Sequence, residues 1–151
     1  MLLLVHGTAT YARNFDWRDD ATLFESAPPG VIQSPRTFYN RAAERWRAGR
    51  VQEAFEDYRT ALRGHPRYAE AWLNLGTLLR TVGKEDEAQR CYERAVLYGR
   101  HTPVPAFVYG KYLEKRGEPV RAARLYRKAL DVYAGFEPAR VRLERLESPA
   151  P

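Results

Sequence analysis

The chain has 151 residues, of which 44% are hydrophobic and 29% are charged, and its formal net charge is +6. This is the balance of an ordinary globular domain, which argues against wholesale disorder, and there is no apolar run of the length that a membrane-spanning helix needs. The one cysteine excludes an internal disulfide and a multi-cysteine zinc site, and it fits a reducing, cytoplasmic compartment. The apolar start is too short for a spanning helix and lacks the features of a secretory signal.

Residues 1–34 form the least regular part of the chain. Trp17, Ala21 and Phe24 follow the i, i+4, i+7 spacing of an amphipathic helix, so we expect one helix at about residues 16–27. A Pro-Pro-Gly run then ends it. Helix–turn–helix units repeat from residue 35 onward, as described next, and this helix stands where the second helix of a unit before the first would be.

From residue 35 onward the same residue types recur at one fixed interval of sequence positions. We call this interval, which separates Gly49 from Gly83, the repeat length. The recurring residues are Gly49, Gly83 and Gly117; Ala54, Ala88 and Ala122; Tyr58, Tyr92 and Tyr126; Ala61, Ala95 and Ala129; and, more loosely, Ala42, Gly76 and Gly110. The small residues let two helices approach closely, and the first group of glycines ends the first helix in the left-handed conformation. The pattern predicts three helix–turn–helix units at residues 35–68, 69–102 and 103–136.

A last helix is expected within residues 137–151. Ala139, Leu143 and Leu146 recur at i, i+4 and i+7 with arginines and glutamates between them. One apolar face and one charged face are typical of a helix that caps the end of a repeat array.

The repeating columns resemble the tetratricopeptide repeat (TPR). The second unit carries the resemblance best, through Trp72, Leu75, Gly76, Leu79, Gly83, Ala88, Tyr92 and Ala95. The resemblance implies an all-α fold, a right-handed α-solenoid of antiparallel helix pairs. It would contain three TPR units, an N-terminal half-repeat helix and a C-terminal capping helix.

The first and third units depart from this pattern. Ala106 stands where the family usually has a large residue, and Arg41 and Arg45 stand at usually apolar positions. Either the two arginines pair with acidic residues of the preceding helix, or they extend to solvent. The acidic residues in question are Asp19, Asp20 and Glu25.

A weaker resemblance concerns residues 13–24. This stretch is similar to the junction between the last membrane span and the repeats in transmembrane, TPR-containing glycosyltransferase-like proteins. It would make residues 2–5 the tail of a span and would place the repeats on the extracytoplasmic side.

In the TPR family the first helix of each unit lines a concave groove, and the resemblance implies fourteen groove residues. They are Tyr39, Asn40, Ala43, Trp46 and Arg47 in the first unit; Leu73, Asn74, Thr77 and Arg80 in the second; and Phe107, Val108, Lys111, Glu114 and Lys115 in the third. Aromatic, Arg and Asn side chains suit a peptide, and the excess of basic residues favours an acidic one. The alternative is that the aromatic side chains at 39, 46 and 107 pack against a neighbouring repeat or against the N-terminal segment.

The groove lacks the clamp with which chaperone-tail adaptors of this family hold a C-terminal carboxylate, since only Asn74 of its five residues is present. The other equivalent positions are Tyr39, Ala43, Val104 and Val108.

No nucleotide-binding, hydrolase or metal motif is found, and the three histidines are scattered. We therefore expect a protein–protein interaction scaffold that needs no cofactor and performs no catalysis. The alternatives are a structural or self-associating TPR module, including the soluble tail of a membrane glycosyltransferase-like protein. Nucleic acid binding is less favoured, because the basic residues are dispersed and alternate with glutamates.

Overall fold

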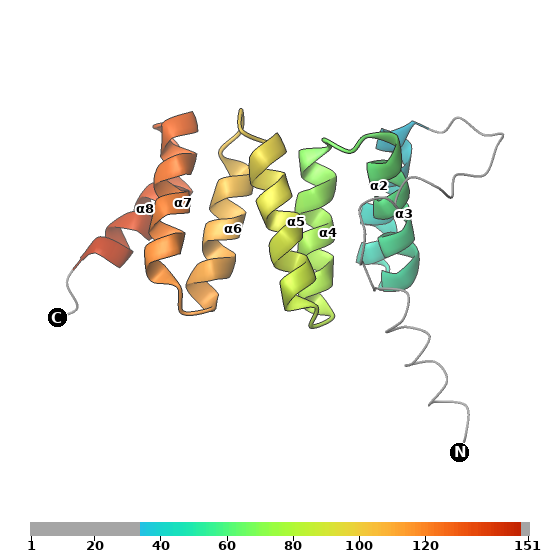
Figure 1. Ribbon diagram of the computed structural model, residues 1–151, viewed down its shortest axis with the longest axis horizontal. Helices are drawn as coiled ribbons and strands as arrows, with labels where there is room; N and C mark the ends of the chain where they lie inside the picture. The colour runs from blue at the N-terminus through green and yellow to red at the C-terminus, as the bar shows by residue number, and fades with distance from the viewer. Residues whose placement is uncertain (1–33, 149–151) are drawn as a thin grey trace, which may run out of the picture. The chain divides into compact units, whose positions relative to one another are not determined.

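The computed structural model describes residues 34–148, in which every regular element is a helix (Figure 1). The chain divides into two compact units, Met1–Gly64 and His65–Pro151. The helices are α2 (Pro35–Arg47) and α3 (Val51–Gly64) in the first unit, and α4 (Ala69–Thr81), α5 (Glu85–Tyr98), α6 (Val104–Lys115), α7 (Pro119–Val132) and α8 (Glu137–Glu147) in the second. The expected all-α fold of helix pairs is therefore confirmed for this part of the chain.

The first unit is the helix pair α2–α3. Ser34 caps α2, since its hydroxyl accepts a 3.2 Å hydrogen bond from the Arg36 N–H, and Pro35 occupies the first turn, where no backbone donor is needed. The two helices meet through Ala42 and Ala54, whose exposed fractions are both 0%. Small residues at this crossing bring the helix backbones close together.

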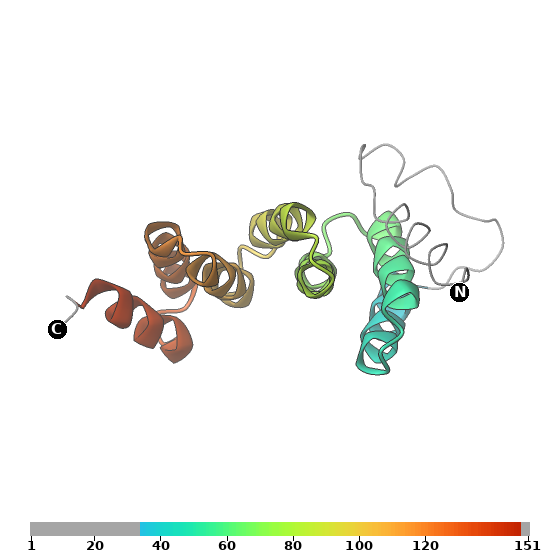
Figure 2. The same ribbon diagram turned by 90° about the horizontal axis from the view of Figure 1, so that it is seen from below.

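The second unit contains two further helix pairs and a closing helix. α4 packs on α5, α6 packs on α7, and α8 packs on α7. In Figure 2 the helices α4, α6 and α8 lie on one side of this unit and α5 and α7 on the other. The first helices of successive pairs thus share one side, which is the side where the sequence places the groove residues.

The turn inside each pair has the conformation that its glycine predicts. Gly49, Gly83 and Gly117 have φ angles of +74°, +79° and +75°. After α4, the Gly83 N–H donates to the Arg80 carbonyl at 3.1 Å and the Lys84 N–H donates to the Leu79 carbonyl at 3.0 Å. This is the Schellman arrangement, in which the left-handed residue lets two carbonyls of the last helical turn find donors.

The repeating small and aromatic residues form the core of each pair. Tyr58, Tyr92 and Tyr126 are all at most 1% exposed, and the alanines at 54, 88 and 122 are 0% exposed. A Cβ placed on Gly110 would lie 2.6 Å from the Tyr126 ring, so the close contact between α6 and α7 requires glycine there.

α8 joins the second unit through the apolar face that its sequence predicts. Ala139 is fully buried, and Leu143 and Leu146 are half-buried. No helix among residues 34–148 has the length and apolar character needed to cross a bilayer. The helix expected at residues 16–27, including the acidic residues considered as partners of Arg41 and Arg45, lies outside the described residues.

Candidate partner-binding surface

The predicted groove residues of the second unit lie on α4 and α6. On α4, Leu73 is 8% exposed, whereas Asn74, Thr77 and Arg80 are half-buried. The Tyr92 hydroxyl of α5 donates to Thr77 Oγ1 at 3.3 Å. Burial raises the pKa of Tyr92, and its hydrogen bonds with Thr77 and Arg80 offset part of that rise. Thr77 and Arg80 therefore reach toward the second helix of their own pair as well as lining the surface.

Phe107 of α6 belongs largely to the packing of its own repeat. Its ring lies 5.9 Å from the ring of Tyr126 and meets Phe136 edge-on at 5.3 Å between centroids. The Lys111 ammonium lies 5.5 Å from the centroid of the Phe107 ring, within the range of a cation–π interaction. Phe107 thus fits the alternative of an aromatic residue that packs against its neighbours, and Lys111 is the charged group it presents beside the surface.

Glu114 is the centre of a hydrogen-bonded cluster between α6, α7 and α8. Its carboxylate accepts a 2.6 Å hydrogen bond from the Tyr126 hydroxyl and contacts at 3.1 and 3.2 Å from Arg142, and it also pairs with Arg145. Burial acts to raise the pKa of Glu114, but the Tyr126 hydrogen bond and the two arginines outweigh it and lower the pKa. Glu114 is therefore ionised at neutral pH and holds α8 against α6.

Arg142 and Arg145 are surface residues of this cluster that the fourteen predicted positions do not include. They follow Val108 and Lys111 by one repeat length each, so they occupy groove positions if α8 is taken as the first helix of a further unit. The sequence therefore contains the signal that would have found them. The interpretation of α8 as a capping helix alone leaves them out.

The remaining five predicted residues lie on α2, in the first unit. Asn40 and Arg47 are exposed, whereas Tyr39, Ala43 and Trp46 are half-buried. The Tyr39 ring lies 6.1 Å from the ring of Tyr58, so it also contacts the core of its own pair. The nine other predicted residues belong to the second unit.

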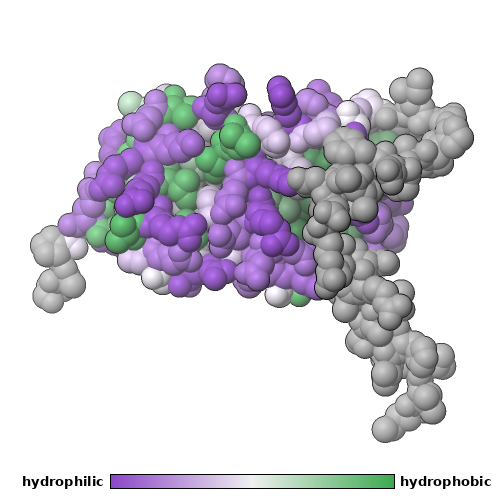
Figure 3. Space-filling model, viewed as in Figure 1, coloured by the Kyte–Doolittle hydropathy of each residue, from purple (hydrophilic) through white to green (hydrophobic). Residues whose placement is uncertain are grey.

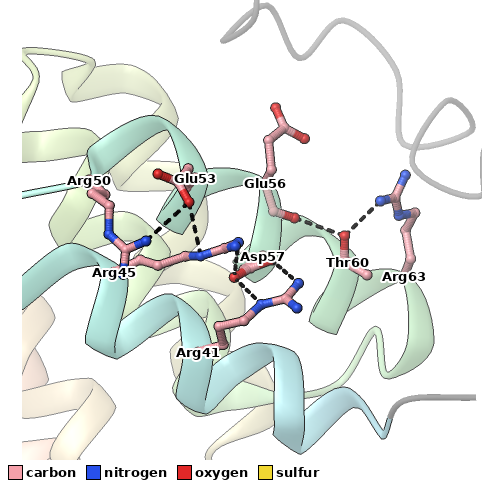
Figure 4. A network of polar contacts seen from close by, with 8 residues as sticks. All are labelled: Arg41, Arg45, Arg50, Glu53, Glu56, Asp57, Thr60 and Arg63. Carbon is pink, nitrogen blue, oxygen red and sulfur yellow. Dashed lines mark hydrogen bonds and ion pairs between the residues drawn. The ribbon is translucent and has the colours of Figure 1, made fainter. Parts of the chain in front are cut away.

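The two unusual arginines of α2 bind a carboxylate of α3, as Figure 4 shows. Arg41 donates to both oxygens of Asp57 at 2.8 and 2.6 Å, and Arg45 donates to Asp57 Oδ2 at 2.6 Å. Arg45 also pairs with Glu53 at 3.2 Å. The expected alternatives named a preceding helix or solvent, but the partner within the described residues is Asp57 of the same unit, with Arg41 still 40% exposed.

Polar groups dominate the surface of the second unit. On the face drawn in Figure 3, hydrophilic residues form broad bands with small hydrophobic patches between them. The large apolar side chains that are exposed are scattered over α5 to α8 and its turns: Leu97, Val104, Val120, Tyr133 and Val141. Recognition on this unit would therefore rely on charged and hydrogen-bonding side chains rather than on one large apolar patch.

The described part of the chain has a buried cysteine and no cluster of metal-ligating side chains. Cys91 is 5% exposed, and burial raises the pKa of its thiol to about 12, so it stays protonated and unreactive. Among residues 34–148 no group of three or more His, Cys, Asp or Glu side chains could hold a metal ion. His65 and His101 are exposed and lie between helices.

Comparison with known proteins agrees with the repeat pattern. Two family models, both described as tetratricopeptide repeat, match residues 45–104 and 75–136. The chain belongs to the tetratricopeptide repeat family. Among curated proteins, this TPR chain is similar to the human protein O-mannosyl-transferase TMTC1, with 37% identity over 84 residues. That match covers 56% of this chain and 10% of the human protein.

Solved structures with the same fold include two proteins with bound peptides. The first TPR of Spaghetti (RPAP3), bound to the HSP90 peptide SRMEEVD, has a TM-score of 0.66 and 16% identity, covering 77% of this chain and 92% of that one. The Yersinia enterocolitica type III secretion chaperone SycD, in complex with a peptide of the translocator YopD, has a TM-score of 0.67 and 18% identity, covering 78% and 97%. At these identities the likeness is one of fold.

Proposed function

We propose that this TPR protein is a non-catalytic scaffold that holds a polypeptide segment of a partner on the side formed by α4, α6 and α8. The observation that carries the proposal is the row of polar and cationic side chains on the first helices of the two pairs and on the closing helix α8. Asn74 and Arg80 come from α4, Lys111 from α6, and Arg142 and Arg145 from α8. Asn pairs with peptide amides, and Arg and Lys pair with carboxylates.

The composition of this surface supports an acidic segment as the ligand. Four of the five side chains named above are cationic, and the carboxylate of Glu114 contacts two of these four. The RPAP3 domain binds an HSP90 peptide. We do not propose that ligand here, because Tyr39, Ala43, Val104 and Val108 replace four residues of the carboxylate clamp. The partner would instead present acidic side chains along the segment.

A second candidate is that the chain is the TPR part of a larger membrane glycosyltransferase-like protein. The similarity to human TMTC1 over 84 residues supports it, together with the resemblance of residues 13–24 to the junction in such proteins. The scaffold would then face the extracytoplasmic side, whereas a separate scaffold would be cytoplasmic. In both cases the TPR surface would bind a polypeptide and the chain itself would need no cofactor.

Selection from a displayed library of random peptides tests the scaffold. We expect peptides that bind the full chain and that bind Asn74→Ala/Arg80→Ala about tenfold more weakly. The matched control is Gln89→Ala/Arg90→Ala, which removes the same two kinds of side chain from the surface of α5 and should bind like the wild type. Equal binding by both double variants would show that the α4 side chains do not form the site.

The self-associating alternative is tested separately by sedimentation equilibrium of the full chain. A monomer that still binds selected peptides agrees with the scaffold. A stable oligomer that binds no peptide would favour a structural module.

A further inference from the structure

The cluster at the α6–α8 contact has more positive than negative charge. Arg142 and Arg145 share the carboxylate of Glu114, and within residues 34–148 neither forms an ion pair with a second acidic residue. Lys111 lies one helical turn before Glu114 on the same side of α6. Two cationic groups therefore contact this anion, and a third lies one helical turn away from it on α6.

The positive groups are the exposed part of this cluster. The Glu114 side chain is 17% exposed, whereas those of Arg142 and Arg145 are 36% and 60% exposed. Arg142 contacts the carboxylate through Nη1 and Arg145 through Nη2. A guanidinium has five N–H donors in a fixed planar fork, so each arginine keeps donors that point away from Glu114.

The position of the arginines connects them to the proposed peptide surface. Arg142 continues the column of Asn74 and Val108, and Arg145 continues the column of Thr77 and Lys111, each one repeat length further along the chain. A segment that crosses α4 and then α6 reaches α8 next. Glu114, which the Tyr126 hydroxyl holds in place, fixes the inner side of the arginine pair, and this lowers the entropic cost of binding a second carboxylate on the outer side.

We propose that Arg142 and Arg145 form a subsite for the carboxylate of an Asp or Glu side chain in the bound polypeptide. The subsite rests on the proposed scaffold function, and it specifies that the part of the polypeptide bound at α8 carries an acidic side chain. Glu114 is a positioning residue, since it holds both arginines without contacting the ligand, and Tyr126 acts through its hydrogen bond to Glu114. A single side-chain carboxylate fits better than the closely spaced phosphates of a nucleic acid, because Glu114 repels additional negative charge near the pair.

Titration of the full chain with a fluorescent hexaglutamate peptide tests the subsite, with hexaglutamine as the uncharged probe. We expect hexaglutamate to bind and hexaglutamine not to bind. Arg142→Gln/Arg145→Gln should weaken hexaglutamate binding by about tenfold or more, since each bond to a carboxylate is charge-assisted. The control Arg90→Gln/Arg124→Gln removes two exposed charges from α5 and α7 and should weaken binding by less than about threefold through long-range attraction alone.

Arg145→Gln alone covers the case in which the double variant loses the packing of α8. It keeps the contact between Arg142 and Glu114, and we expect about threefold weaker binding with an unchanged circular dichroism spectrum. An effect of that size on a folded chain supports the subsite. Wild-type affinity in this variant would overturn it.

The remaining outcomes separate the subsite from the scaffold function. Equal losses in the two double variants would show diffuse attraction and overturn the subsite. If library peptides bind the α4 residues but hexaglutamate does not bind, the scaffold stands and the subsite is wrong. If neither binds, both proposals fail. If a short oligothymidine binds through Arg142 and Arg145 as tightly as hexaglutamate, the arginines do not select a side-chain carboxylate and the proposed subsite is overturned.

Discussion

Two carboxylates in this chain are each held by a pair of arginines, one in each unit, and they differ in what faces solvent. Asp57 in the first unit has a side chain 5% exposed, and its partners Arg41 and Arg45 are 40% and 24% exposed. Glu114 in the second unit is 17% exposed, with Arg145 at 60%. The first cluster is therefore mainly internal to a helix pair, whereas the second presents its positive side at the surface.

The repeat register shows what the first cluster replaces. Arg41, Arg45 and Asp57 stand one repeat length before Leu75, Leu79 and Cys91, whose exposed fractions are 0%, 0% and 5%. The same three positions are thus ionic in the first helix pair and apolar in the second. A buried ion pair is often no more stabilising than apolar residues of similar volume, although breaking it is costly. The two units give the opportunity to measure that difference within one fold.

The largest effect is expected from Asp57→Ala, which leaves Arg41 and Arg45 without their shared carboxylate. Removing one partner of a fully buried ion pair costs roughly 3–5 kcal/mol. We expect a loss of about 2–3 kcal/mol in the free energy of unfolding, because Arg41 remains partly hydrated. Urea unfolding of the full chain measures it. Glu44→Ala, at an exposed position of α2, is the control and should change stability by less than about 0.5 kcal/mol. Similar values for both variants would show that the cluster adds little.

Introducing the residues of the second unit into the first should stabilise the chain instead of destabilising it. We expect Arg41→Leu/Arg45→Leu/Asp57→Cys to raise the free energy of unfolding by about 1–2 kcal/mol, because apolar side chains avoid the desolvation of three charges. The control is Arg41→Leu alone, which leaves the carboxylate with one arginine and should be less stable than the wild type. A triple variant below the wild type in stability would mean that the ionic cluster is the better core for this pair.

A smaller loss is expected from Glu114→Gln. The amide keeps an acceptor for the Tyr126 hydroxyl but removes the charge that holds Arg142 and Arg145. We expect a loss of about 1 kcal/mol, near the upper end for exposed ion pairs, since Arg145 is largely hydrated already. Urea unfolding measures the change. Glu144→Gln, on an exposed position of α8, should be neutral. A loss as large as that expected for Asp57→Ala would place the second cluster in the same class as the first.

The sequence predicts the regular parts of this fold better than it predicts the two clusters. Glycine at 49, 83 and 117 predicts the left-handed turn that is observed, and the alanine and tyrosine columns are buried as expected. These features depend on backbone geometry and side-chain volume. Both are visible in the sequence, because residues of the same kind recur at the same position of each unit. The role of Asp57 does not follow in this way, because an ion pair depends on which side chains meet across two helices, and spacing along the chain does not specify that.

The sequence predicts the positions of the candidate surface but not all the contacts within it. The fourteen groove positions come from the family register, and nine of them lie on α4 and α6. That register also reaches Arg142 and Arg145, but a helix with one apolar face is equally typical of a cap. Arg142 and Arg145 contact Glu114 across 28 and 31 positions of the chain. Spacing along the sequence does not predict such a contact, so only the structure shows it.

The smallest expected effect is the pH dependence of the second cluster. The pKa of Glu114 is lower in the folded chain than in the unfolded chain, where a glutamate titrates at about 4.3. The stability from its ionised form is therefore fully present above that pH and is lost as the pH falls through the lowered, folded-state pKa. We expect the difference in the free energy of unfolding between wild type and Glu114→Gln to be constant from pH 7 to pH 5 and to shrink below about pH 4. Urea unfolding at a series of pH values measures that difference, and Glu144→Gln provides the baseline. A difference that stays constant to pH 2 would mean that the carboxyl group stabilises the fold through its hydrogen bonds and not through its charge. Attraction to a negative charge would then not explain why the two arginines contact Glu114.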